Sequence, residues 1–127
     1  MKVQRWSKLI SVVWAGSICL VIFYSLTPRV EFPVDFWEAD KFYHFIAYGW
    51  LSILPMIGYS PRKLAVNASL SMIILGILLE IGQLYVPGRM FSVADITANT
   101  LGVILGIFCA DYLRPLTEKL RRKLFNA

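Results

Sequence analysis

The stretch LAVNASLSMIILGILLEIGQLY, residues 64–85, decides how this chain folds. A helix of roughly 20 apolar residues crosses the hydrocarbon core of a bilayer, so this stretch is long enough to span it. Its one acidic residue is Glu80. A charged side chain at mid-helix costs on the order of 2.5–3.5 kcal/mol on insertion scales. Glu80 therefore needs a partner, a proton or a water-filled pocket, and it is the first candidate for a functional site.

Further apolar stretches indicate several membrane spans. The 127 residues are 57% hydrophobic and only 17% charged, whereas soluble domains carry about 25% charged residues. We therefore predict a single all-α, polytopic membrane domain, residues 1–127, with four transmembrane helices. The first apolar stretch lacks the small-residue cleavage site of a signal peptide, so we expect it to be retained. The predicted spans are residues 9–26, 42–59, 64–85 and 96–113, followed by a basic tail, residues 114–127.

Basic residues in short loops predict the orientation of such a domain. Ten of the 13 Lys and Arg residues fall on one predicted side and three on the other, which makes the richer side, with both termini, cytoplasmic. They flank spans and form no basic face, which argues against a nucleic-acid partner. The cytoplasmic set is Lys2, Arg5, Lys8, Arg62, Lys63, Arg114, Lys119, Arg121, Arg122 and Lys123, and the opposite set is Arg29, Lys41 and Arg89.

Helical spacing sorts the polar residues of the last three spans into stripes. Residues four or seven apart share a helix face, and small or polar residues on such faces favour helix–helix contact. The stripes therefore predict that these three spans face one another. The first stripe is Asp40, His44 and Tyr48 with Lys41 beside it, the second is Gly76, Glu80 and Gln83, and the third is Asp95, Asn99, Gly102 and Gly106.

The polar residues also share a depth. The rise of a helix is about 1.5 Å per residue. Four polar residues therefore lie in the outer third of the bilayer, namely His44, Glu80, Gln83 and Asn99. Arg89 lies above them, after a Pro87-Gly88 pair typical of a type II turn. Ser92 and Asp95 have the spacing of a capping box, which begins a helix. We expect an outward-facing polar pocket in which Asp95 orients Arg89.

Each of these residues also has a structural interpretation. Asp95 can serve only as a helix cap and Arg89 only as an interface marker. Asn99 and Gln83 can simply bond one helix to another, which we favour over ligand contact for both. His44 can be a packing histidine, although its position one turn from Asp40 favours a functional role. Glu80 can form a structural ion pair with Arg89, Lys41 or His44.

Together these residues resemble the VanZ-like family of small bacterial membrane proteins. The resemblance covers about residues 40–106 and implies a multi-pass protein of the bacterial inner membrane. The family takes its name from a member associated with resistance to the glycopeptide teicoplanin. The motifs that carry the resemblance are Asp40-Lys41-x-x-His44-Phe45-x-x-Tyr48, then Glu80-x-x-Gln83-x-x-x-Pro87-x-Arg89, then Asp95-x-x-x-Asn99-x-x-Gly102-x-x-x-Gly106.

We weigh several functions for the predicted pocket. The first is binding or processing of an anionic, lipid-linked envelope molecule, such as a polyprenyl-phosphate-linked precursor. Glu80 and His44 would handle protons as the catalytic pair. Arg89 and Lys41 would hold phosphate. The remaining substrate-binding candidates are Asp40, Tyr48, Gln83, Asp95 and Asn99.

The other functions need different properties. A scaffold or accessory subunit would use the polar cluster only to lock helices together. A proton-coupled transporter with so few spans would have to dimerise. A metal site using His44, Glu80 and Asp95 has no metal-ligand motif behind it, so we expect no metal and no cofactor. Membrane lipids are the expected partners in every case.

Overall fold

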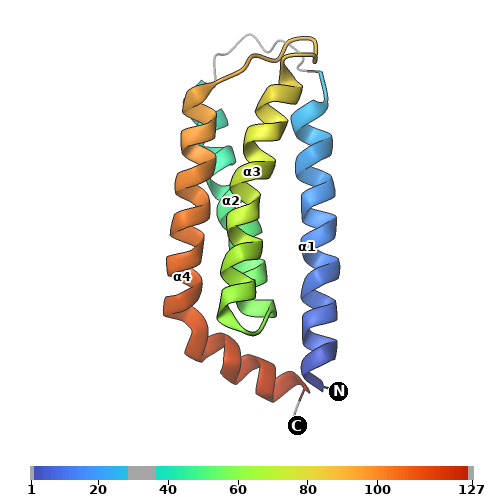
Figure 1. The fold of residues 1–127 in the computed structure, drawn as a ribbon, viewed down its shortest axis with the longest axis vertical. Helices are drawn as coiled ribbons and strands as arrows, with labels where there is room; N and C mark the ends of the chain where they lie inside the picture. Colours follow the sequence, from blue (N-terminus) through green and yellow to red (C-terminus); the bar gives the residue numbers. More distant parts are fainter. Residues whose placement is uncertain (1, 29–36, 126–127) are drawn as a thin grey trace.

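The chain folds into a bundle of four helices, shown in Figure 1. The computed structural model describes residues 2–28 and 37–125, and the side chains of residues 2, 3 and 37–40 lie outside that description. Each predicted span falls largely within one helix, so the all-helical prediction is confirmed. The helices are α1, Lys2–Leu26, α2, Trp37–Gly58, α3, Arg62–Gln83, and α4, Val93–Phe125.

Three of these helices are long and apolar enough to cross a membrane, namely α1 over Gln4–Leu26, α3 and α4. The described part of α2, residues 41–58, is not among them, although the whole helix is 22 residues long. It carries the polar stripe with His44 and Tyr48, and it packs against each of the other three helices. A helix enclosed by protein needs less apolar surface than one facing lipid, so its polar stripe does not argue against a membrane crossing by α2. That crossing stays a prediction.

The closest helix pair is α2 with α4, which meet along a seam of small residues. A Cβ at Gly102 would fall on the carbonyl oxygen of Phe45, and one at Gly106 would fall on Ser52 Oγ and lie 2.6 Å from the carbonyl oxygen of Gly49. Only glycine lets the two backbones come this close. The stripe that carries Gly102 and Gly106 therefore does face α2, as its spacing predicts.

The helix α1 is held to α2 by side-chain donors. Trp6 Nε1 donates to the carbonyl oxygen of Ile57 at 2.7 Å, and Ser7 Oγ donates to that of Gly58 at 2.7 Å. Further along, Trp14 Nε1 donates to the carbonyl oxygen of Leu51 at 2.9 Å. The last turn of a helix leaves carbonyls without intrahelical partners, so α1 satisfies the end of α2 as it packs.

The two ends of the bundle are formed by different segments of the chain (Figure 1). One end holds the start of α1 and the end of α4, and the other holds the turn between α3 and α4. In that turn Gly88 has φ 75° and Arg89 N donates to the carbonyl oxygen of Val86 at 3.1 Å, which confirms the predicted turn. A positive φ at the third turn position is the reason glycine stands there.

The end of α4 differs from the prediction. We expected the span to end at residue 113, before Pro115, and a basic amphipathic tail with Leu120 and Leu124 at helical spacing to lie along the inner membrane surface. Instead, one helix continues to Phe125. Proline inside a helix removes one hydrogen bond and bends the axis without necessarily ending the helix. Past the bend the basic segment runs beneath the bundle to α1 (Figure 1), where the Phe125 ring meets that of Trp6 with centroids 5.6 Å apart.

Candidate functional site

The three predicted stripes converge near the α3–α4 turn. A Cβ placed on Gly76 of α3 would lie 3.1 Å from Asn99 Nδ2 of α4 and 3.1 Å from Tyr48 Cε1 of α2. Tyr48 is 2% exposed and Asn99 is 1% exposed. Glycine at this point therefore lets polar side chains from two helices pack against the third, as the spacing predicts.

His44 is oriented by Asn99. Its Nδ1 lies 3.0 Å from Asn99 Oδ1. An amide oxygen only accepts hydrogen bonds, so Nδ1 carries the hydrogen in this contact. The other ring nitrogen, Nε2, lies 3.8 Å from Asp95 Oδ2. That separation is too long for a direct hydrogen bond but within the range of an ion pair when the imidazole is protonated.

The start of α4 departs from a simple capping box. Asp95 N donates to Ser92 Oγ at 3.2 Å, which is the predicted cap. In a complete box the acidic side chain would accept from the backbone N–H of Ser92. Here Glu80 Oε2, from α3, accepts that N–H at 3.0 Å instead. Because Glu80 takes this role, the Asp95 carboxylate is directed toward His44.

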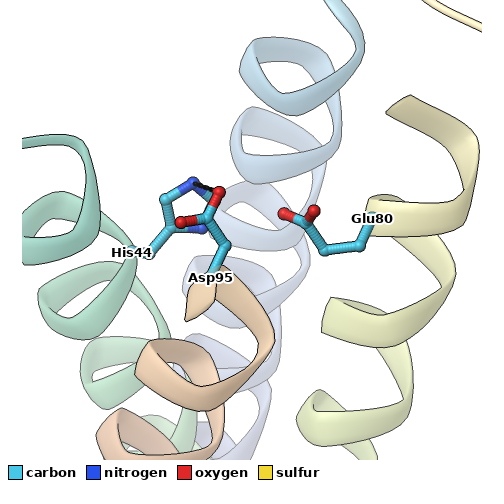
Figure 2. A group of neighbouring side chains, drawn as sticks. All are labelled: His44, Glu80 and Asp95. Carbon is cyan, nitrogen blue, oxygen red and sulfur yellow. Dashed lines mark ion pairs between the residues drawn. The ribbon is translucent and has the colours of Figure 1, made fainter. Parts of the chain in front are cut away.

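Figure 2 shows the result, with the side chains of His44, Glu80 and Asp95 directed toward a common space from α2, α3 and α4, respectively. One ligand atom from each residue lies within 4.8 Å of the others. Glu80 is 1% exposed and Asp95 is 8% exposed. Two carboxylates this close and this buried repel one another unless a positive charge or a proton lies nearby. The positive end of α4 supplies part of that compensation.

Arg89 and Gln83 bind the end of α1. Arg89 Nε donates to the carbonyl oxygen of Thr27 at 3.1 Å and Nη2 to that of Tyr24 at 2.7 Å. Gln83 Nε2 donates to the carbonyl oxygen of Ser25 at 3.0 Å. A cation at a helix C-terminus satisfies its carbonyls and its dipole. Our expectation that Asp95 orients Arg89 is wrong, because backbone carbonyls orient Arg89 and Asp95 faces His44.

A cavity of about 260 Å³ lies beside this cluster. It does not hold all the predicted residues, because Glu80, Asp95 and Asn99 are not part of its described lining. They pack behind His44, which belongs both to the cluster and to the cavity wall. The prediction of one shared pocket therefore becomes a cavity with an adjoining buried carboxylate pair. The lining residues are Leu20, Val21, Tyr24, Ser25, Tyr43, His44, Ala47, Tyr48, Gln83 and Arg89.

The remaining predicted residues lie at the margin. Lys41 is in α2, about one turn before His44, and its side chain is partly exposed. Asp40 is also in α2, but its side chain lies outside the described residues. Neither residue belongs to the described cavity lining. Their substrate-binding roles stay predictions.

Sequence reasoning missed two contributions to the site. The first is α1, which carries none of the predicted polar stripes but which supplies part of the cavity wall and the carbonyls that hold Arg89 and Gln83. The unpaired carbonyls at any helix end were the available signal. The second is the backbone N–H of Ser92, which binds Glu80. Every residue except proline carries a backbone N–H, so no pattern of side chains in the sequence identifies this one as a binding group.

Fold and site thus define a helical protein with membrane-spanning character and a buried polar centre near one end of its bundle. A model of the VanZ/LLP1 family matches residues 3–114, and the chain belongs to this family. The match extends beyond the motifs of residues 40–106 to include α1. No curated protein and no solved structure matches the chain.

Proposed function

We propose that this protein binds an anionic, lipid-linked molecule of the cell envelope in the cavity between α1, α2 and α3. A polyprenyl-phosphate-linked precursor has the required chemistry. The observation that carries the proposal is the composition of the cavity wall, which combines Arg89 and His44 with apolar side chains. Such a wall suits a ligand with a charged head and a hydrocarbon tail.

The apolar part of the wall reaches the surface of the bundle. Leu20 and Tyr24 of α1 and Tyr43 of α2 line the cavity, and they are 58%, 65% and 69% exposed. A lipid chain lying along these side chains would place its head group against the polar wall. The ligand would enter sideways from the bilayer, between α1 and α2.

The polar part of the wall suits phosphate. The positive charge of Arg89, which carbonyls of α1 hold at the cavity wall, would attract a phosphate, and Lys41 would add a second cation from α2. His44 faces the cavity on one side and the carboxylates on the other. If the bound molecule is processed, His44 and Glu80 would move the proton in a general acid–base hydrolysis or group transfer.

The distribution of basic residues supports an outward-facing cavity. The cavity is lined by the end of α1, the first half of α2 and the α3–α4 turn, where Lys and Arg are few. The basic segment after Pro115 lies at the other end of the bundle (Figure 1). Under the positive-inside rule the cavity would face the outer leaflet of the bacterial inner membrane, where envelope precursors display their head groups.

Native mass spectrometry of the protein purified with its lipids tests the binding. We expect the wild-type protein to retain a polyprenyl phosphate or an anionic glycolipid, and Arg89→Gln to lose it. Arg62→Gln, at the opposite end of the bundle, is the matched control and should retain it. Thermal melts of both variants show whether they remain folded. Zwitterionic lipid alone on the wild-type protein would overturn the proposal.

Glu80→Gln tests the proton role. Glutamine keeps an acceptor for the N–H of Ser92 but removes the charge, so the variant should express and melt as the wild type does. In a complementation assay we expect it to be inactive. Full activity would exclude a role for Glu80 in moving protons. The same assay, with teicoplanin susceptibility as its readout, tests the proposed link to glycopeptide resistance.

The alternative is a scaffold or accessory subunit in which the polar cluster only joins helices. One observation favours it: no buried side-chain nitrogen or oxygen among the described residues lacks a hydrogen-bond partner. A site with all its polar groups satisfied internally also suits a structural role. Under this alternative Glu80→Gln would lose activity only together with folded protein.

A further inference from the structure

We propose that His44, Glu80 and Asp95 bind a divalent transition-metal ion, with Zn²⁺ preferred. This inference goes beyond lipid binding and does not depend on it. It rests on the meeting of one imidazole and two carboxylates from three different helices. The sequence contains no metal-ligand motif because each donor comes from a separate helix, and only the fold brings them together.

The spacing of the donor atoms suits a metal ion. His44, Glu80 and Asp95 each offer one atom within 4.8 Å of the others, and the His44 Nε2 to Asp95 Oδ2 distance is 3.8 Å. Zinc bonds of about 2.0–2.2 Å in tetrahedral geometry separate neighbouring ligands by about 3.4 Å. Small rotations of the two carboxylates reach this spacing. Figure 2 shows them turned toward the imidazole already.

The surrounding groups hold the ligands as metal sites require. A ligating histidine usually gives its second ring N–H to a carbonyl or carboxylate oxygen. Asn99 Oδ1 accepts from His44 Nδ1 at 3.0 Å, which directs the lone pair of Nε2 toward the carboxylates. Ser92 N donates to Glu80 Oε2 at 3.0 Å and fixes that carboxylate in turn.

The charge balance also favours a cation. In the neutral form that binds metals, His44 would turn the lone pair of Nε2 toward two carboxylates, and three electron-rich groups would meet in a buried space. A divalent ion would neutralise both carboxylates and accept the imidazole lone pair at once. One nitrogen and two oxygens favour Zn²⁺ over Mn²⁺ by the ordinary order of affinities, and they disfavour Ca²⁺ and Mg²⁺, which prefer oxygen alone.

The site would retain an open position. Three protein ligands leave a tetrahedral ion one further bond, to water or to an oxygen of a bound molecule. Because His44 also lines the cavity, that position lies near the place proposed for a phosphate. Only this last step rests on the proposed function.

Metal analysis of the purified full chain tests the site. The protein is stripped with a chelator, loaded with Zn²⁺ and washed. We expect about one ion per chain for the wild type and for Asp111→Asn, a control carboxylate paired with Arg62 at the other end of the bundle. His44→Gln and Asp95→Asn should each lose the ion. Asn99→Ala, which removes only the support of the imidazole, should weaken Zn²⁺ binding roughly 10–100-fold.

The absorption spectrum of the Co²⁺-loaded wild-type protein tests the site even if a variant misfolds. Co²⁺ in place of Zn²⁺ should give the visible absorption of a four-coordinate site in the wild-type protein, and added Zn²⁺ should abolish it. Failure of the wild type to retain Zn²⁺ above the background of the wash would overturn the inference. So would wild-type retention in both His44→Gln and Asp95→Asn, or equal retention of Ca²⁺.

The result separates this inference from the lipid proposal. Lipid retention is measured on the same chelator-stripped and Zn²⁺-loaded samples. Retained anionic lipid without a stoichiometric ion would defeat the metal site alone. A bound ion without retained anionic lipid would support the metal site and defeat the lipid proposal.

Discussion

The contact between α2 and α4 changes character along its length. At its middle, Gly102 and Gly106 of α4 lie so close to α2 that a Cβ on either would collide with the backbone of Phe45 or Gly49. One turn nearer the α3–α4 turn, His44 meets Asn99 and Asp95 through polar atoms. In the first region the size of a side chain decides which residues fit, and in the second region hydrogen bonding and charge decide. The fixed glycine seam is what holds the polar groups at bonding distance.

A methyl group in the glycine seam should have the largest effect on stability. Gly102→Ala would place a Cβ on the carbonyl oxygen of Phe45 and 3.2 Å from Gly49 N, and neither backbone atom can move without its helix. Overpacking of this kind costs typically about 1–3 kcal/mol, and more where backbone must shift. We expect a markedly lower melting temperature in detergent, or no folded protein.

Gly16→Ala is the matched control for the seam. This glycine lies in α1 with no atom within 4 Å of an added Cβ. Alanine favours the helix by up to about 1 kcal/mol, so the control should melt at or slightly above the wild-type temperature. Equal melting of the Gly102 and Gly16 variants would refute the contrast between the two regions.

Loss of a polar partner should have the next largest effect. Asn99→Ala removes the acceptor of His44 Nδ1 in a buried place, and such a loss costs about 1–3 kcal/mol. Asn99→Asp keeps an acceptor of the same size, so a change in its melting temperature measures the effect of the added negative charge. Asn67→Ala, on the exposed face of α3, is the control and should be silent. Thermal melts of chelator-treated protein measure all three, and a silent Asn99→Ala would show that the polar region does not hold the helices.

The smallest effect should come from the exposed ion pair at the other end of the bundle. Arg62 Nη2 donates to Asp111 Oδ2 at 2.5 Å, but both side chains face solvent to a large extent. Solvent and salt screen such pairs. A double-mutant cycle with Arg62→Gln and Asp111→Asn should give a coupling that is lost at high salt. A coupling as large as the effect of Asn99→Ala would reverse the proposed ranking.

Much of the fold follows from local chemistry that the sequence displays. Long apolar runs can form only helices in a bilayer, and a Pro-Gly pair specifies a turn with positive φ, as Gly88 has. Periodicity then fixes which face of each helix is polar, so Glu80, His44 and Asn99 could be assigned to meeting faces in advance. The spacing of Leu120 and Leu124 indicates an amphipathic tail but not that it continues α4 without a break, because proline bends or ends a helix according to its surroundings.

What the sequence determined by itself is the class of protein and the faces on which its polar residues lie, because both depend on spacing along a single helix. The tertiary structure decided the partners. The Ser92 N–H binds Glu80 and leaves the Asp95 carboxylate to His44, while Arg89 binds the end of α1. Backbone donors and acceptors are the same at every residue, so only their placement in space selects which side chain they bind.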